Sequence, residues 1–342
     1  MKRFHIPGIR REVALAVVAA LALLIALADP QVHLTRATVD ALVVLDITQS
    51  MNATDATLEG KRVSRLEFAK SMLQRVLPRL PCGSRVGWGV FTEYRVFVLF
   101  TPVEVCANYD ELSATLERID NRMAWVGGSE IAKALYGFLA RLGRMDPRPS
   151  LVFITDGHEA PPLNPHMRLT FQGKAGEIPG TLLGVGGDQL VPIPKRDRDG
   201  TLVGFWGADE VPQTDLYSQG RPTSVAGESM VDDRGNPERP IPPSGTEQLS
   251  SLKEAHLREL SVETGLGYER LESVEGLYAT LTQPALAHRA SVLTRVRFAP
   301  TAIALLLLLL LTSWPRLVVS KSLRPRSTPE LSAETTRGAP TT

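Results

Sequence analysis

The chain has 342 residues, with 38 lysines and arginines against 37 aspartates and glutamates, so its formal net charge is +1 at pH 7. This balance, without a dense basic block in the middle of the chain, gives no support to nucleic-acid binding. Two cysteines are too few for a disulfide-dense scaffold, and they form no CxxC pair of the kind that indicates zinc.

The first segment, residues 1–30, contains an apolar run from Val13 to Ala28 that follows several lysines and arginines. This pattern is typical of an export signal or of an uncleaved membrane anchor, and the sequence leaves both open. The stretch from Ala26 to Ala28 resembles a signal-peptidase site, and the run is short for the roughly 20 residues of a membrane span.

A buried strand is predicted from Ala41 to Asp46, after a short link, and it ends in oxygen-bearing side chains at alternate positions. These side chains belong to Asp46, Thr48 and Ser50. A carboxylate and two hydroxyls suit Mg²⁺, Mn²⁺ or Ca²⁺. The same residue types also end strands and cap helices, so this stretch in isolation favours a structural role.

The next elements are a core helix at 65–77 and two β-rich runs, 86–92 and 96–101, that predict an antiparallel hairpin. A turn centred on Tyr94 places Cys82 and Cys106 opposite one another. Because opposed residues of paired strands approach disulfide geometry, we expect a bond between them. The alternative is two free thiols whose symmetry is accidental.

A second amphipathic helix is predicted at 109–119, and two glycines then precede Ser129. We expect Ser129 to cap the following helix, which explains this serine without a metal. A buried strand at 151–154 ends at Asp156, and a short strand at 181–185 ends in a glycine pair that is too weak a signal for a dinucleotide site.

Strands that alternate with helices predict an α/β fold: a doubly wound, mostly parallel sheet with one antiparallel edge hairpin. Ligands bind such sheets beyond the carboxyl ends of the strands. Asp46 and Asp156 both lie at carboxyl ends, and the loop that holds Ser129 can reach the same edge.

The remaining segments depart from this alternation. Residues 187–245 are rich in Pro, Gly and charge, which predicts an irregular insertion with one small hairpin at 195–206. A helix at 252–262, closed by Thr264 and Gly265, and a short strand at 268–271 complete the domain. Beyond it we expect a helical linker at 273–297, a transmembrane helix at 298–319 and a disordered cytoplasmic tail at 320–342.

Three motifs resemble the metal-ion-dependent adhesion site (MIDAS) of von Willebrand factor type A domains. They are Asp46-Ile47-Thr48-Gln49-Ser50, Gly127-Gly128-Ser129-Glu130-Ile131 and Ile154-Thr155-Asp156-Gly157. Thr48 stands where the family more often has serine, and Ser129 where it more often has threonine, but both keep a hydroxyl. The resemblance covers about residues 38–272 and implies a Rossmann-like fold.

The resemblance implies a site for Mg²⁺, or for Mn²⁺ or Ca²⁺. The hydroxyls of Thr48, Ser50 and Ser129 would contact the cation, and Asp46 and Asp156 would bind it mainly through water. An open position would then take an acidic side chain from a partner. This is a binding site and not an enzyme site, because the motifs contain no positioned nucleophile. His158 and Glu159 are interpreted as loop residues, and a metal-dependent hydrolase is the alternative.

The arrangement of a hydrophobic segment, an A domain and a C-terminal membrane helix resembles the bacterial Bat (aerotolerance operon) proteins. Asp46 to Asn52 and Ile119 to Trp125 look more like the MxaL and MxaC type of methanol dehydrogenase accessory protein. That family implies an inner-membrane protein with its A domain in the periplasm. It would assist assembly or metal loading of an exported client, such as the calcium-containing quinoprotein methanol dehydrogenase.

The implied partners are a protein client that presents a carboxylate, other A-domain proteins of the same operon and a MoxR-type AAA ATPase. An alternative is a structural component of an envelope complex with a Bat-like stress role and a vestigial metal site.

Overall fold

The computed structural model describes residues 7–124, 127–163, 169–211, 213 and 245–322. The predicted tail from residue 323 onward and most of the predicted insertion, at 212 and 214–244, lie outside the described residues. The chain forms two compact units: Met1–Leu34 with Leu293–Thr342, and Thr35–Val292.

The first unit contains the helices α1 (Pro7–Leu27) and α7 (Phe298–Ser322), which contact each other. Both carry large apolar side chains at their surface, including Leu24 and Leu305. Within the described part of the chain, no helix combines the length and the apolarity that crossing a membrane requires, so the predicted membrane segments are not confirmed.

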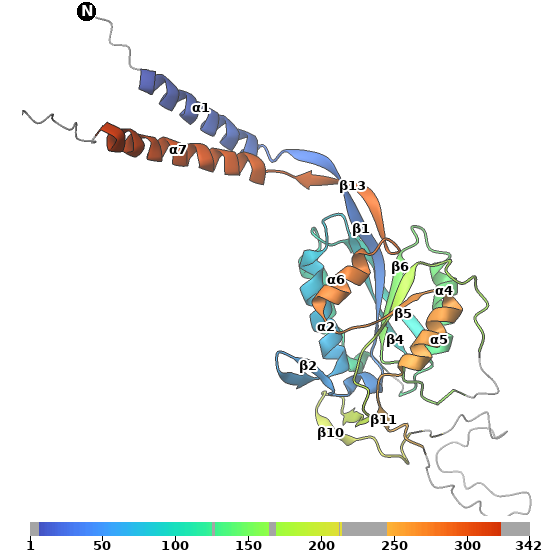
Figure 1. Ribbon diagram of the computed structural model, residues 1–342. Coiled ribbons are helices and arrows are strands. Elements are labelled where there is room, and N and C mark those ends of the chain that lie inside the picture. Colours follow the sequence, from blue (N-terminus) through green and yellow to red (C-terminus); the bar gives the residue numbers. More distant parts are fainter. Residues whose placement is uncertain (1–6, 125–126, 164–168, 212, 214–244, 323–342) are drawn as a thin grey trace, which may run out of the picture. The chain divides into compact units, whose positions relative to one another are not determined.

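The second unit is built on a seven-stranded sheet with helices on both faces (Figure 1). Its strand order is β12-β7-β6-β1-β4-β5, and β13 also pairs with β1. All pairs along this order are parallel except the hairpin of β4 and β5. The predicted mostly parallel sheet with one antiparallel edge hairpin is therefore confirmed. The strands are β1 (Gln31–Asp46), β4 (Arg85–Thr92), β5 (Arg95–Glu104), β6 (Ser150–Thr155), β7 (Gly180–Gly184), β12 (Gly267–Arg270) and β13 (Ala287–Arg295).

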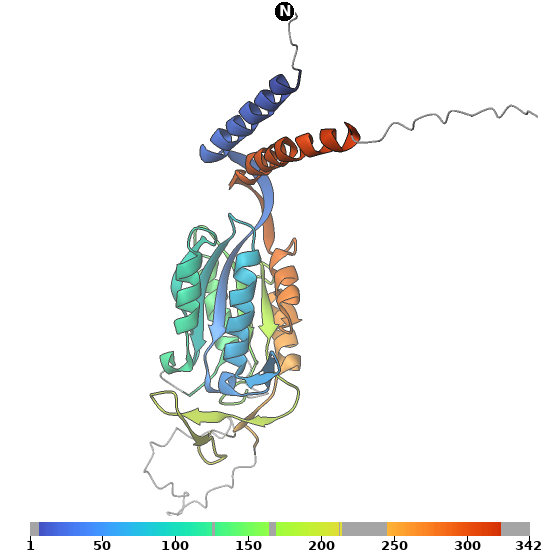
Figure 2. The same cartoon turned by 90° about the vertical axis from the view of Figure 1, so that its left-hand side faces the viewer.

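Two hydrophobic cores fill the spaces between the sheet and its helices, which Figure 1 shows on either side of the strands; Figure 2 views the sheet from the side of α2 and α6. Strand β1 contributes Val43 and Leu45 to one core and Leu42 and Val44 to the other. Successive side chains of a strand point to opposite faces, so a strand buried on both faces is apolar throughout. The helices are α2 (Arg65–Val76), α3 (Tyr109–Arg118) and α6 (Val274–Thr282) against the first core, and α4 (Ile131–Leu142) and α5 (Glu254–Thr264) against the second.

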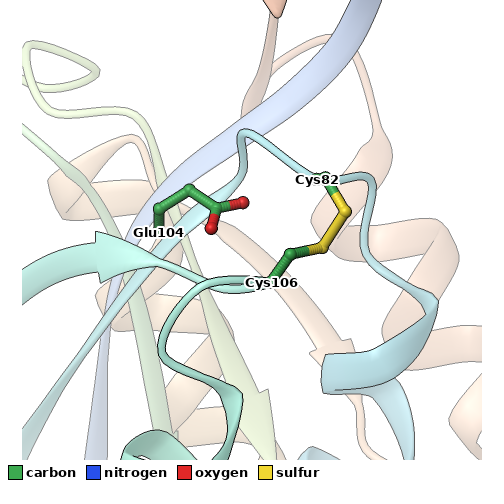
Figure 3. Close-up of side chains that lie close together, drawn as sticks. All are labelled: Cys82, Glu104 and Cys106. Carbon is green, nitrogen blue, oxygen red and sulfur yellow. A yellow bond between two sulfur atoms is a disulfide. The ribbon is translucent and has the colours of Figure 1, made fainter. Parts of the chain in front are cut away.

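A disulfide joins Cys82 to Cys106 across the open end of the β4–β5 hairpin, with the Cα atoms 5.3 Å apart (Figure 3). The hairpin pairs Thr92 with Arg95, so its turn is not centred on Tyr94 as predicted, and two irregularities shift the register along the strands. The carboxylate of Glu104 connects the segments that contain the two cysteines. It accepts hydrogen bonds from the backbone N–H of Gly83, next to Cys82, over 2.7 Å and from that of Ala107, next to Cys106, over 2.6 Å.

The predicted helical linker at 273–297 is wrong beyond its first part. Helix α6 ends at Thr282, and residues 287–295 form strand β13. Pro284 lacks the N–H group that a continuing helix needs. The long strand β1 also offers backbone groups with which β13 pairs, and the side chain of Thr38 lies 3.3 Å from His288.

Several short strands, among them β2, β10 and β11, lie near the carboxyl edge of the sheet (Figure 1). The predicted hairpin at 195–206 is present as β9 and β10, which pair antiparallel. The short strands are β2 (Ala56–Leu58), β3 (Lys61–Val63), β8 (Val191–Pro192), β9 (Pro194–Arg196), β10 (Leu202–Phe205) and β11 (Leu249–Ser250). The 3₁₀ turns are η1 (Gln49–Asn52), η2 (Leu77–Arg79) and η3 (Asn121–Met123).

Candidate metal-binding site

The two predicted carboxylates lie at the ends of neighbouring strands. Asp46 is the last residue of β1, and Asp156 follows β6 directly. These strands run parallel, with Leu45 opposite Ile154, so their carboxyl ends meet at one edge of the sheet. Both aspartates are fully buried.

Asp46 is held on both oxygens by hydroxyl and backbone donors. Its Oδ1 accepts hydrogen bonds from the N–H and the hydroxyl of Thr48, over 2.8 and 2.7 Å. Its Oδ2 accepts one from the hydroxyl of Thr155 over 2.6 Å. The hydroxyl oxygens of Thr48 and Ser50 lie 3.3 Å apart, within hydrogen-bonding distance. The turn η1 thus folds the two predicted hydroxyl ligands back over Asp46.

Asp156 is engaged by a buried guanidinium. Its Oδ2 accepts a hydrogen bond from Nη1 of Arg65 over 2.5 Å, and its Oδ1 accepts one from the N–H of His158 over 3.0 Å. Arg65 also donates to both carboxylate oxygens of Asp55, over 2.9 and 2.7 Å. One positive charge therefore bridges two carboxylates behind the site.

The electrostatic environment of Asp46 disfavours its charge. Burial, followed by the nearby carboxylate of Asp156, raises the pKa of Asp46 to about 7. Hydrogen bonds from Thr155 and Thr48 oppose this rise in part. A cation bound beside Asp46 would favour the ionised form of the carboxylate, because opposite charges stabilise each other in a buried site.

Ser129 reaches this edge from the loop before α4. Its backbone exchanges hydrogen bonds with Ala160 over 2.7 and 2.8 Å. Its hydroxyl is buried and has no hydrogen-bond partner. The prediction that Ser129 caps α4 is wrong: Glu159 does so, because its two carboxylate oxygens accept from the N–H groups of Ile131 and Ala132, each over 2.9 Å.

A cavity of about 360 Å³ opens over these residues. Thr48, Ser50 and Ser129 line it, whereas Asp46 and Asp156 lie behind the lining residues. Asp46 accepts a hydrogen bond from the hydroxyl of Thr48, and Asp156 accepts one from the N–H of His158. His158 also lines the cavity, and burial lowers its pKa. The structure thus brings the three predicted hydroxyls to one cavity and places the two predicted carboxylates behind it.

A family model for the von Willebrand factor type A domain matches residues 41–158, the segment that contains all three motifs. The match covers about a third of the chain and shows similarity of this segment to that domain. The comparison with curated proteins found no match.

The chain is also similar to solved structures at low identity. An aerotolerance-related membrane protein from Bacteroides fragilis is 20% identical with a TM-score of 0.44, over 72% of this chain and 98% of that one. BatB, a conserved hypothetical protein from Bacteroides thetaiotaomicron, is 22% identical with a TM-score of 0.44, over 72% of this chain and 96% of that one.

The donor set of this cavity fits a hard divalent cation. Mg²⁺ prefers oxygen ligands and keeps several of its waters, and the cavity offers neutral hydroxyls with carboxylates behind them. A buried hydroxyl without a partner costs about 1–3 kcal/mol, and a bound cation would give the hydroxyl of Ser129 a partner. Thr48, Ser50 and Ser129 would hold the ion, which would supply a positive charge for a carboxylate.

Three residues of this site have roles that the sequence did not reveal. Arg65 was assigned only to a core helix, Thr155 only to a motif, and Glu159 only to a loop. Arg65 had one usable signal, a charged residue at the start of an apolar helical face. The partners of Thr155 and Glu159 are distant in the chain, at Asp46 and at the start of α4, so no local pattern identifies them.

Proposed function

We propose that the von Willebrand factor type A domain binds Mg²⁺ through Thr48, Ser50 and Ser129 and uses the ion to bind a carboxylate of a partner protein. Asp46 and Asp156 would act on the ion mainly through water. The observation that carries the proposal is the hydroxyl of Ser129, which is buried without a hydrogen-bond partner in the cavity that Thr48 and Ser50 also line.

The hydrogen bonding of Asp46 and Asp156 supports a role for these two carboxylates in binding and not as a general base. Both oxygens of Asp46 and both oxygens of Asp156 accept hydrogen bonds from protein groups. A general base needs a free acceptor within reach of the proton that it removes. A metal-dependent hydrolase would instead turn over phosphate or ester substrates with Mg²⁺, and a panel of such substrates tests this alternative.

We also propose that α1 and α7 associate with a membrane and hold the domain on its outer, periplasmic side. The apolar side chains at the surface of both helices support this, among them Val17, Leu24, Leu305 and Leu309. Membrane fractionation with protease protection of the intact protein tests it. Protein that is washed from membranes by salt alone would contradict it.

The client remains an expectation from the resemblance to the accessory proteins of methanol dehydrogenase: an exported protein that needs assembly or metal loading. The alternative, a structural part of an envelope complex with a Bat-like stress role and a MoxR-type ATPase partner, does not require the metal site. Metal removal should abolish partner binding if the protein binds a client through the ion, and should leave it unchanged if the protein is a structural part of a complex.

A cross-linked pull-down tests the proposed function. The intact protein, Asp46→Ala and Ser129→Ala are compared in Mg²⁺ and in EDTA, with Phe205→Ala as a control whose side chain is 55% exposed. We expect one partner to be lost in both site variants and in EDTA, and kept by the control. A partner retained by all variants and in EDTA would contradict metal-dependent docking and favour the structural component.

A further inference from the structure

The cavity over the hydroxyls has a second wall that comes from the segment between β7 and α5. Ile193 and Trp206 line this wall, and Pro161 lines it from the loop after β6. The wall is held by the backbone, because the N–H of Trp206 donates to the carbonyl of Ile193 over 3.1 Å. Ile193 is 4% exposed, so the wall is part of the packed structure. A ligand at the hydroxyls therefore meets a fixed apolar surface.

Three polar side chains of this cavity lack hydrogen-bond partners. They are Ser129, through its hydroxyl, His158, through both ring nitrogens, and Trp206, through its indole N–H, and all four atoms are buried. Ser129 and His158 are each only 2% exposed. Buried polar atoms without hydrogen-bond partners are uncommon in native proteins and require an explanation. Their presence in one cavity indicates a ligand that brings polar groups to it.

The same cavity is also lined by two acidic side chains. Glu247 lines it, with a carboxylate oxygen 3.5 Å from Nε2 of His158, and so does Glu210, which pairs with Lys195. A second negative charge on the ligand would be repelled by Glu247, because like charges at short distance destabilise each other. The cavity thus combines hydroxyls, suited to a cation and a carboxylate, with an apolar wall and two acidic side chains.

We propose that this cavity takes a partner segment in which a single acidic residue is followed directly by a large apolar residue. The proposal rests on the proposed function, since the acidic side chain would reach the ion at Ser50 and Ser129. The apolar side chain would lie against Ile193 and Trp206. A backbone carbonyl of the partner segment would accept a hydrogen bond from the indole N–H of Trp206. A volume of about 360 Å³ suits adjacent side chains of one segment.

Binding of three short blocked peptides to the full chain in detergent and Mg²⁺ tests this proposal by fluorescence anisotropy. Their cores are Gly-Asp-Leu-Gly, Gly-Asp-Gly-Gly and Gly-Asp-Asp-Gly. Each is measured with the wild type, Trp206→Ala and Ile193→Ala. Phe205→Ala is the matched control, because it lies next to Trp206 but does not line the cavity.

Burial of the leucine side chain is expected to make its peptide bind about tenfold more tightly than the glycine peptide. This ratio should fall toward one in Trp206→Ala and Ile193→Ala and persist in Phe205→Ala, and the second aspartate should weaken binding. Equal binding of all three peptides to the wild type, or a ratio kept by both wall variants, would overturn the inference and leave the proposed function standing.

Two further outcomes are decisive. If no peptide binds in Mg²⁺, both the inference and the proposed function fail. If Mg²⁺ produces a dimer in sedimentation that the leucine peptide does not dissociate, the cavity takes a second copy of the chain, and the inference is wrong.

Discussion

The buried guanidinium of Arg65 donates a hydrogen bond to the carboxylate of Asp156 over 2.5 Å and so connects the first turn of α2 to the end of β6. The same guanidinium forms an ion pair with Asp55 through Nη2. It also donates hydrogen bonds to the hydroxyl and the carbonyl oxygen of Ser250, over 2.7 and 3.1 Å. Arg65 therefore fixes Asp156 from behind and leaves the opposite side of the edge, where the cavity lies, to the hydroxyls.

Replacement of Arg65 by methionine is expected to lower the free energy of unfolding by about 3–5 kcal/mol, because two buried carboxylates lose their positive partner. Urea denaturation measures this. Arg75→Ala is the control: its pair with Glu59 lies at the surface, and such pairs contribute at most about 1 kcal/mol. A loss below that of the control would show that Asp156 does not depend on Arg65.

The cap of α4 gives a second prediction. Glu159→Ala should cost about 1–2 kcal/mol, since two N–H groups at the start of α4 lose their acceptor. Thermal unfolding followed by circular dichroism measures this cost. Glu130→Ala, which removes only a surface pair with Lys133, should stay within about 0.5 kcal/mol of the wild type. Equal effects of the two changes would argue against the cap.

The disulfide closes a loop whose ends are 24 residues apart. Loss of a crosslink of this span, in the double variant Cys82→Ser and Cys106→Ser, should destabilise the protein by roughly 3 kcal/mol, because the unfolded chain gains freedom. The urea midpoint of the oxidised wild type, compared with that of the variant, measures the difference. Coincident midpoints would contradict a stabilising crosslink.

Elements with a strong local pattern could be predicted from the sequence. The buried strand at Asp46, the helix after Arg65 and the loop before Ser129 follow from apolar runs and periodicity, and the structure contains all three. The parallel sheet then follows from the alternation of elements, and the site from the position of polar residues at strand ends.

Features that depend on tertiary pairing could not be predicted in this way. Strand β13 was assigned to a helix, because its pairing with β1 is a contact across most of the chain. The cap by Glu159 and the bridge by Arg65 likewise join residues that no sequence spacing relates. The irregularities that shift the hairpin register between Val86 and Gly89 leave no mark in a period-two pattern, so the sequence could not predict them.

Ser129→Ala should not destabilise the metal-free protein and should raise its free energy of unfolding by up to about 1–3 kcal/mol, because it removes a buried hydroxyl that has no protein partner. Thermal unfolding in EDTA measures this. Thr155→Val is the contrasting variant: its hydroxyl donates to buried Asp46, so its loss should cost about 1–3 kcal/mol. If Ser129→Ala is as destabilising as Thr155→Val, the hydroxyl of Ser129 has a structural role.

A calorimetric titration of Mg²⁺ into the wild type and into Ser129→Ala tests the central claim most directly. The account predicts one Mg²⁺ site in the wild type, with stabilisation that reaches about 2.7 kcal/mol when Mg²⁺ is at a hundred times its Kd. In Ser129→Ala, this binding should weaken strongly although the stability of the metal-free protein is not lowered. Equal Mg²⁺ affinity in both proteins, or no binding to the wild type, would contradict the account.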